Sequence, residues 1–233
     1  MTRVFDRFFY RIAVSIFCCS LACSWGAGQD ATRFEKEVTE LEERARERGI
    51  SKGGIVCVGS SSMRMWTPRI EQDLAPLSVV PMGFGGSQFS DAIHYFDRLV
   101  AAYEPRAVLV YEGDNDVAKG KTPVVVARDF LDFVRLCHEQ NSEMRVYVIS
   151  IKPSIARASV WPQAVKANAM LKAICEEDER LNFIDVAHAL IGRDGVAKER
   201  YFVEDGIHLN DLGYDRWARA VRKVIVPNEI DFE

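Results

Sequence analysis

The sequence predicts an α/β fold in which a five-stranded parallel sheet is covered by helices on both faces. Five short apolar segments, several of them rich in β-branched residues, have the pattern of buried strands. Segments with helical periodicity separate them, and strands that alternate with helices build parallel sheets. The connections are short, and 233 residues are enough for one well-packed domain.

The first expected elements are a helix over residues 31–48 and a strand over residues 54–59. In the helix, Phe34, Val38 and Leu41 recur at helical spacing among many charged residues, as in a helix that lies over a core. The strand ends in Gly59, and small hydroxyl residues follow it. We therefore expect a tight turn into a short helix at this point.

The rest of the chain repeats this alternation. The remaining expected strands cover residues 77–82, 107–111, 144–151 and 181–186. A helix over residues 87–103 should stop at Glu104-Pro105, because proline disfavours helical geometry in the residue before it. Further helices should begin at Pro123, follow Pro162 through Cys175, and cover residues 211–226.

Residues 1–28 have the order of a secretory signal. Three arginines precede a short apolar stretch, and small residues follow it. The stretch is shorter than the roughly 20 apolar residues that span a bilayer. We expect cleavage near residues 26–28 and an exported protein, periplasmic or secreted, whose residues 29–233 form a single domain; an uncleaved anchor is the alternative.

Charge and cysteine content exclude several classes of protein. Residues 1–28 contain three arginines and one aspartate, so their removal changes the formal charge from −4 to −6. A mildly acidic domain argues against nucleic acid and against anionic membrane surfaces as partners, and we expect no stable membrane insertion of the mature domain. Three cysteines remain, with no CxxC spacing, and an odd number predicts buried thiols rather than a disulfide framework or a zinc site.

Three consecutive strands end in unusual loops: Gly59-Ser60-Ser61, Gly83-Phe84-Gly85-Gly86 and Gly113-Asp114-Asn115-Asp116. The carboxyl ends of parallel strands share one edge of the sheet, which is where ligands bind in such folds. A hydroxyl, glycine N–H groups and an asparagine amide should therefore meet there. Such donors stabilise the oxyanion formed when a serine attacks a carbonyl.

Asp205 and His208 can supply the base that such a serine needs. They precede the last helix with a spacing that lets the carboxylate hold the imidazole while its other nitrogen takes the serine proton. Asp185 and His188 have the same spacing, so spacing alone does not separate the two pairs. The segment around His188 leads from the fifth strand into Leu190, and we expect that histidine at the edge of the core.

These four blocks, in this order, resemble those of the SGNH (GDSL-like) hydrolases over essentially the whole mature chain. The resemblance implies a flavodoxin-like three-layer α/β/α sandwich and ester hydrolysis through a serine acyl-enzyme, without a metal or organic cofactor. It implies Ser61 as nucleophile, Asp205 and His208 as its partners, and the N–H of Ser61, Gly86 and Asn115 as the oxyanion site. Ser60 departs from the family, which commonly has aspartate there.

Other motifs fit less well. Met63 replaces the second glycine of a GxSxG elbow, and Gln88 replaces the third glycine of a dinucleotide-binding fingerprint. Glu112, Asp114 and Asp116 lack the spacing of a calcium loop.

The function expected from the sequence is hydrolysis of a carboxylic (O-acyl) ester. The substrate would be a small molecule, or a glycan or lipid ester, with a small or short acyl chain. The departure at Ser60 leaves open a noncatalytic module that binds envelope glycans, and acyl transfer to a carbohydrate would use the same residues. Four aromatic residues could line an acyl pocket or belong to the core: Trp66, Phe84, Phe89 and Trp161.

Overall fold

The structure is a computed structural model that describes residue 30 and residues 32–49 and 52–233. The predicted signal segment, residues 1–28, lies outside the described residues. One compact unit covers Ala31–Glu233.

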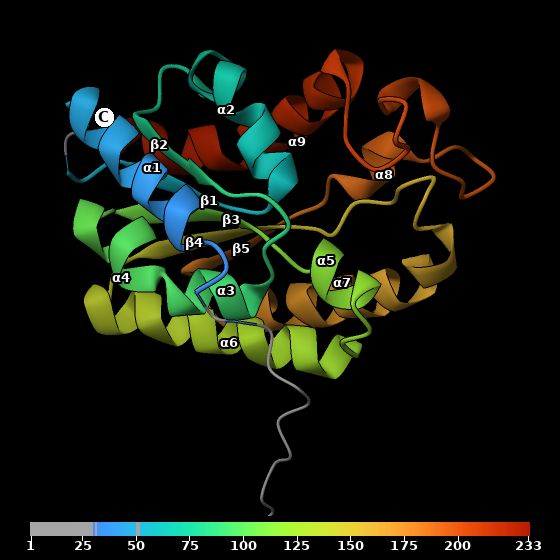
Figure 1. The fold of residues 1–233 in the computed structure, drawn as a ribbon, viewed down its shortest axis with the longest axis horizontal. Coiled ribbons are helices and arrows are strands. Elements are labelled where there is room, and N and C mark those ends of the chain that lie inside the picture. Colours follow the sequence, from blue (N-terminus) through green and yellow to red (C-terminus); the bar gives the residue numbers. More distant parts are fainter. Residues whose placement is uncertain (1–29, 31, 50–51) are drawn as a thin grey trace, which may run out of the picture. The chain divides into compact units, whose positions relative to one another are not determined.

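The sheet contains five strands, all parallel, in the order β2-β1-β3-β4-β5 (Figure 1). The strands are β1 (Ile55–Gly59), β2 (Val79–Gly83), β3 (Ala107–Tyr111), β4 (Arg145–Ile149) and β5 (Leu181–Ile184). β1 lies in the middle of the first three, and Gly59 is in register with Gly83 on one side and Tyr111 on the other. The three loops singled out in the sequence therefore leave the same edge of the sheet, as predicted, and they lie side by side because their strands are neighbours.

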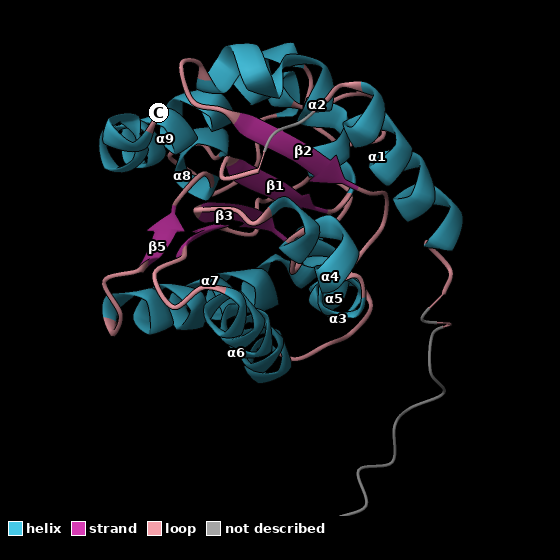
Figure 2. Cartoon of the chain, turned by 90° about the vertical axis from the view of Figure 1, so that its left-hand side faces the viewer, coloured by secondary structure: helices cyan, strands magenta, loops and turns pink. Residues whose placement is uncertain are grey.

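Helices cover both faces of this sheet, which confirms the predicted three-layer α/β/α architecture (Figure 2). The α-helices are α1 (Glu35–Glu47), α2 (Ser61–Leu74), α3 (Phe89–His94), α4 (Phe96–Leu99), α5 (Asp114–Ala118), α6 (Pro123–Gln140), α7 (Trp161–Glu176), α8 (Ala187–Leu190) and α9 (Asp211–Glu229). One apolar cluster contains residues of α1, α3, α4, α6 and α7, and the other contains residues of α2, α8 and α9.

The strands are buried because their side chains face one or the other of these two clusters. In β1, Val56 and Val58 belong to the first cluster, and Ile55 and Cys57 belong to the second. All five residues of β1 are buried. A strand with no polar face is what a parallel sheet covered on both sides requires.

The predicted single helix over residues 87–103 is wrong. The chain forms α3, then α4, and then a 3-10 turn over Ala101–Tyr103. The break falls at Tyr95, whose φ of −98° and ψ of 15° leave helical geometry while its ring packs edge-on against Phe84. Helical periodicity alone does not detect this break, because the apolar residues on either side of it still face the core.

The three cysteines within the described residues are free and buried, as predicted. Burial raises the pKa of the Cys57 thiol, and it raises the pKa of Cys175 to about 12. These thiols therefore stay protonated and pack as apolar groups. Over the same part of the chain, no helix has both the length and the apolarity needed to cross a bilayer.

Candidate active site

Ser61 lies at the carboxyl edge of the sheet because the chain turns sharply after β1. Gly59 ends the strand, Ser60 is the N-cap residue, and Ser61 is the first residue of α2. A Cβ atom at Gly59 would lie 2.3 Å from the carbonyl oxygen of Tyr111, so only glycine permits this close approach of β1 and β3. The Ser60 side chain makes no hydrogen bond that caps α2. The serine that stands where the family commonly has aspartate therefore does not stabilise the start of this helix.

His208 contacts Ser61, although the two residues are 147 positions apart in the sequence. Its Nε2 lies 2.7 Å from Ser61 Oγ, and its Nδ1 lies 2.5 Å from Asp205 Oδ2. Because Nδ1 faces a carboxylate, it carries the ring proton and leaves Nε2 free to accept the serine hydroxyl. The three side chains thus form a chain from carboxylate to imidazole to hydroxyl.

The Asp205 carboxylate is held on both oxygens. Oδ1 accepts hydrogen bonds from the backbone N–H of Ile207 and His208, at 2.8 and 2.9 Å, and Oδ2 accepts from the ring. Partial burial works against ionisation, but these three hydrogen bonds outweigh it and lower the pKa of Asp205 to about 2. The carboxylate therefore remains charged and fixes the orientation of the ring.

The competing pair, Asp185 and His188, has almost the same local geometry. His188 Nδ1 lies 2.6 Å from Asp185 Oδ2, but the histidine side chain is 84% exposed, compared with 21% for His208. The expectation that His188 lies at the edge of the core is therefore wrong. The four-residue α8 that follows β5 leaves this ring in solvent.

The predicted oxyanion donors come from three adjacent loops. Asn115, in the first turn of α5, donates from Nδ2 to the carbonyl oxygen of Ser87 at 2.8 Å, which ties the β3 loop to the β2 loop. Gly86 precedes that carbonyl with a φ of +77°. Ser61, as the first residue of α2, has an N–H without an intrahelical acceptor.

A buried carboxyl group forms a hydrogen bond to the loop that contains Gly86. Ser87 donates from Oγ to Glu112 Oε1 at 2.6 Å, and Glu112 is fully buried. Burial, reinforced by the nearby charge of Asp116, raises the pKa of Glu112 well above its usual range. Its neutral form is therefore favoured, and Ser87 contacts both Glu112, through Oγ, and Asn115, through its carbonyl oxygen.

The three acidic residues around Asn115 are each engaged separately. Glu112 bonds to Ser87, Asp114 pairs with Lys152 and Arg157, and Asp116 pairs with Lys121. Among the residues that the structure describes, no group of three histidine, cysteine, aspartate or glutamate side chains is arranged to hold a metal ion.

The four aromatic residues considered for an acyl pocket separate into two groups. Trp66, Phe84 and Phe89 are fully buried and belong to the core. Trp161 lines a cavity of about 250 Å³ between residues 153–161 and the turn at 195–197. Neither Ser61 nor His208 lines this cavity. One of its lining residues, Ile155, lies against the Asp205–His208 loop, since a Cβ atom at Gly206 would lie 3.2 Å from Cβ of Ile155.

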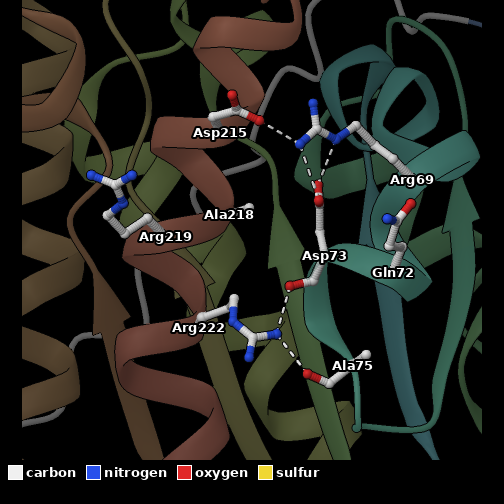
Figure 3. A pocket seen from close by; sticks show the side chains of 8 residues that line it. All are labelled: Arg69, Gln72, Asp73, Ala75, Asp215, Ala218, Arg219 and Arg222. Carbon is white, nitrogen blue, oxygen red and sulfur yellow. Dashed lines mark hydrogen bonds and ion pairs between the residues drawn. The ribbon is translucent and has the colours of Figure 1, made fainter.

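A larger groove, of about 590 Å³, lies between α2 and α9, and neither Ser61 nor His208 lines it (Figure 3). Two of its arginines are already paired. Arg69 bonds to Asp73 and Asp215, and Arg222 donates to the carbonyl oxygens of Asp73 and Ala75 at the end of α2. These contacts fasten together the helix that begins at Ser61 and the helix that follows His208.

Two cations lie next to Asn115 that were not predicted from the sequence. Lys152 is fully buried and ion-paired with Asp114, and Arg157 contacts both Asp114 and Asn115. A signal for the first was present, because Lys152 follows the fourth apolar segment directly and so falls at the carboxyl edge of the sheet. Arg157 lies within a loop, where sequence pattern does not assign contacts.

Comparisons with known proteins bear on the family and the fold of the chain. The family model described as GDSL-like Lipase/Acylhydrolase matches residues 27–216. No curated protein sequence matches the chain.

Solved structures of similar fold come from several bacteria. A protein assigned as an acylhydrolase, from Bacteroides fragilis, is 18% identical, with a TM-score of 0.70 over 86% of this chain and 99% of that one. A GDSL-like lipase from Bacteroides thetaiotaomicron is 16% identical, with a TM-score of 0.68 over 85% and 100%. A mutant of an acetyl-xylooligosaccharide esterase from Geobacillus Stearmophilus is 16% identical, with a TM-score of 0.59 over 75% and 94%.

Proposed function

Because the chain belongs to the GDSL-like lipase/acylhydrolase family, we propose that it hydrolyses a carboxylic (O-acyl) ester through an acyl-enzyme on Ser61. The observation that supports this most directly is the 2.7 Å separation of Ser61 Oγ and His208 Nε2. A serine hydroxyl is a weak nucleophile until an adjacent base can take its proton.

In the proposed reaction, Ser61 Oγ attacks the ester carbonyl as its proton passes to His208 Nε2. The carbonyl oxygen becomes an oxyanion that accepts hydrogen bonds from the N–H of Ser61 and Gly86 and from Asn115 Nδ2. His208 then gives the proton to the departing alcohol, and the serine keeps the acyl group. Asp205 stays ionised throughout and holds the ring.

Water completes the cycle by the same route. His208 removes a proton from a water molecule, the resulting hydroxide attacks the acyl carbon, and the acid leaves as Ser61 recovers its proton. No cofactor is needed, since every proton moves between the imidazole and an oxygen.

We further propose that the acyl group is small. The 250 Å³ cavity beside the Asp205–His208 loop has room for a short group, and Pro153, Ile155 and Trp161 give it an apolar wall. One protein of similar fold is an esterase of acetylated xylo-oligosaccharides, so an acetate ester is the first probe to use. The proposed place of action is outside the cytoplasm, given the signal-like order of residues 1–28.

Turnover of a chromogenic acetate or butyrate ester tests this function. Wild type should release the chromophore, and Ser61→Ala or His208→Ala should lower kcat by about 10³-fold or more, as loss of a nucleophile or its base does in other serine hydrolases. His188→Ala is the matched control, because it removes the same side chain from the other Asp–x–x–His pair, and its kcat should equal that of wild type.

Three outcomes would count against the proposal. They are an inert wild type that still binds a glycan, turnover that survives in Ser61→Ala, and loss of activity in His188→Ala. Adding a sugar acceptor to the assay separates transfer from hydrolysis, since an acyltransferase would form acylated sugar in place of free acid.

A further inference from the structure

Asn115 lies against a group of buried and half-buried charges contributed by the loop after β4. We infer that Arg157 is a positioning residue for ester hydrolysis, acting through Asn115, and that Lys152 and Arg157 together place a surplus positive charge behind the oxyanion site. This inference rests on the proposed function and adds two residues to it.

The first step concerns the orientation of the Asn115 amide. Arg157 donates from Nη2 to Asn115 Oδ1 at 3.0 Å, while Asn115 Nδ2 donates to Ser87 O at 2.8 Å. A flip of the amide would turn Nδ2 toward the guanidinium and Oδ1 toward the carbonyl, so both contacts would become repulsive. Arg157 thereby selects the orientation that leaves the second Nδ2 hydrogen for an oxyanion.

The second step concerns charge. Asp114 is ion-paired with two cations: Lys152 Nζ lies 3.1 Å from Oδ2, and Arg157 Nη1 lies 2.7 Å from Oδ1. Burial disfavours the Asp114 carboxylate, but the two positive charges outweigh burial and lower its pKa. One carboxylate between two cations leaves a net charge of about +1 next to Asn115.

The other acidic groups nearby do not cancel this surplus. Burial raises the pKa of Glu112 well above its usual range, which favours its neutral form. Asp116 and Asp129 are balanced by two cations, since Lys121 pairs with both at 2.8 Å and Arg128 pairs with Asp129 at 3.1 Å. Lys152 is fully buried, so water does not screen its charge well. A fixed positive charge in a dry site favours the negative charge that develops in the transition state more than it favours the neutral ester.

The third step is the attachment of the Arg157 loop. Ala156 donates its N–H to the carbonyl oxygen of Gly206 at 3.1 Å, and Gly206 lies between Asp205 and His208. The loop therefore joins the part of the site that holds the base to the part that holds the oxyanion. Arg157 is tied to the geometry of both.

A double-mutant cycle tests the inference. The kcat and KM of wild type, Arg157→Gln, Asn115→Ala and the double variant are measured on a chromogenic acetate ester. Arg157→Gln should lower kcat by about 10-fold or more, with little change in KM, since it weakens a donor used in the transition state. In the Asn115→Ala background the same substitution should lower kcat by a clearly smaller factor, about 3-fold, because the contribution made through Asn115 is gone and only that of the positive charge remains.

Two further variants complete the experiment. Arg157→Lys keeps the charge but loses the fork that reaches both Asp114 and Asn115, so its kcat should lie between those of wild type and Arg157→Gln. Arg193→Gln, at an exposed arginine outside the site, should match wild type. Melting temperatures identify any variant that is unfolded, and Arg157→Lys carries the test if Arg157→Gln fails to fold.

The outcomes separate this inference from the proposed function. Equal fold-losses from Arg157→Gln in the wild-type and Asn115→Ala backgrounds would overturn the inference and leave the esterase intact. A rise in KM with unchanged kcat would overturn it too, because Arg157 would then contact substrate directly. A wild type that neither hydrolyses esters nor reacts with a serine-directed phosphonate would overturn the proposed function, and this inference with it.

Discussion

At the scale of single residues, the site distinguishes two histidines that the sequence presents alike. His208 and His188 each follow an aspartate by three positions, and each ring bonds to that aspartate. Of the two, it is His208 that has a serine hydroxyl on its other side and is mostly shielded from water. The functional assignment therefore depends on what faces Nε2, a contact between distant parts of the chain.

The sequence predicted a site made of Ser61, Asp205, His208, Gly86 and Asn115. Three of these residues follow strands whose ends share one edge of the sheet, and all five lie in motifs that occur in the order of a known family. The sequence did not predict the contacts of Arg157, because the direction of a side chain in a loop is not encoded in the sequence pattern. Nor did it identify Glu112 as a neutral acid, since that state depends on complete burial.

Glu112 gives a pH-dependent prediction. Its pKa is raised on folding, so the folded protein keeps a proton that the unfolded chain releases above its ordinary value of 4.5. Wild type should therefore lose stability as pH rises from about 4.5 toward the raised pKa, by up to about 1.4 kcal/mol per pH unit. Glu112→Gln cannot ionise and should escape this loss.

Thermal or urea unfolding at a series of pH values checks this. The variant and wild type should be similar near pH 4, and the variant should become increasingly more stable above it. Glu43→Gln, at an exposed glutamate of α1, provides the control for removal of a negative charge. A constant difference between Glu112→Gln and wild type at all pH values would contradict a buried, protonated Glu112.

At the scale of elements, the turn from β1 to α2 determines where the nucleophile lies. Gly59 touches the backbone of β3, so the strand can end only with a residue that has no side chain. The strand and the following helix were predictable from an apolar run that ends in glycine and hydroxyl residues. The break at Tyr95 was not, because it depends on how one ring packs against Phe84.

Gly59→Ala tests this element. The new Cβ atom would clash with backbone at 2.3 Å at the end of a central strand, and we expect a loss of more than about 4 kcal/mol in the free energy of unfolding. Gly120→Ala is the matched control. Gly120 also has a positive φ, of +89°, but no atom lies within 4 Å of the position that its methyl group would take, so only backbone strain of about 1–2 kcal/mol is expected. Similar losses in the two variants, measured by urea unfolding, would contradict the close approach at Gly59.

At the scale of the whole molecule, the carboxyl ends and the amino ends of the strands carry different groups of residues. The carboxyl edge carries the site, where three loops and the Asp205–His208 segment converge. At the opposite edge, Glu229 at the end of α9 is fully buried and bonds to Arg145 and to the Tyr147 hydroxyl. α9 is thus fixed at its far end by ion pairs, and its first turn follows directly from the loop that holds His208.

The alternation of strands and helices predicted this arrangement in outline, since parallel strands must send their carboxyl ends to one edge. It did not predict the strand order or the charge cluster behind Asn115, because both depend on contacts between segments that no local pattern encodes. We propose that Ser61 and His208, brought together by this fold, form a reactive pair.

Covalent labelling by a serine-reactive phosphonate, located by peptide mass, tests that claim most directly. We expect one adduct, on Ser61, that forms at the wild-type rate in His188→Ala and at least about 100-fold more slowly in His208→Ala, because the base is lost. An adduct on another serine, or labelling of Ser61 that is unaffected by loss of His208, would contradict it.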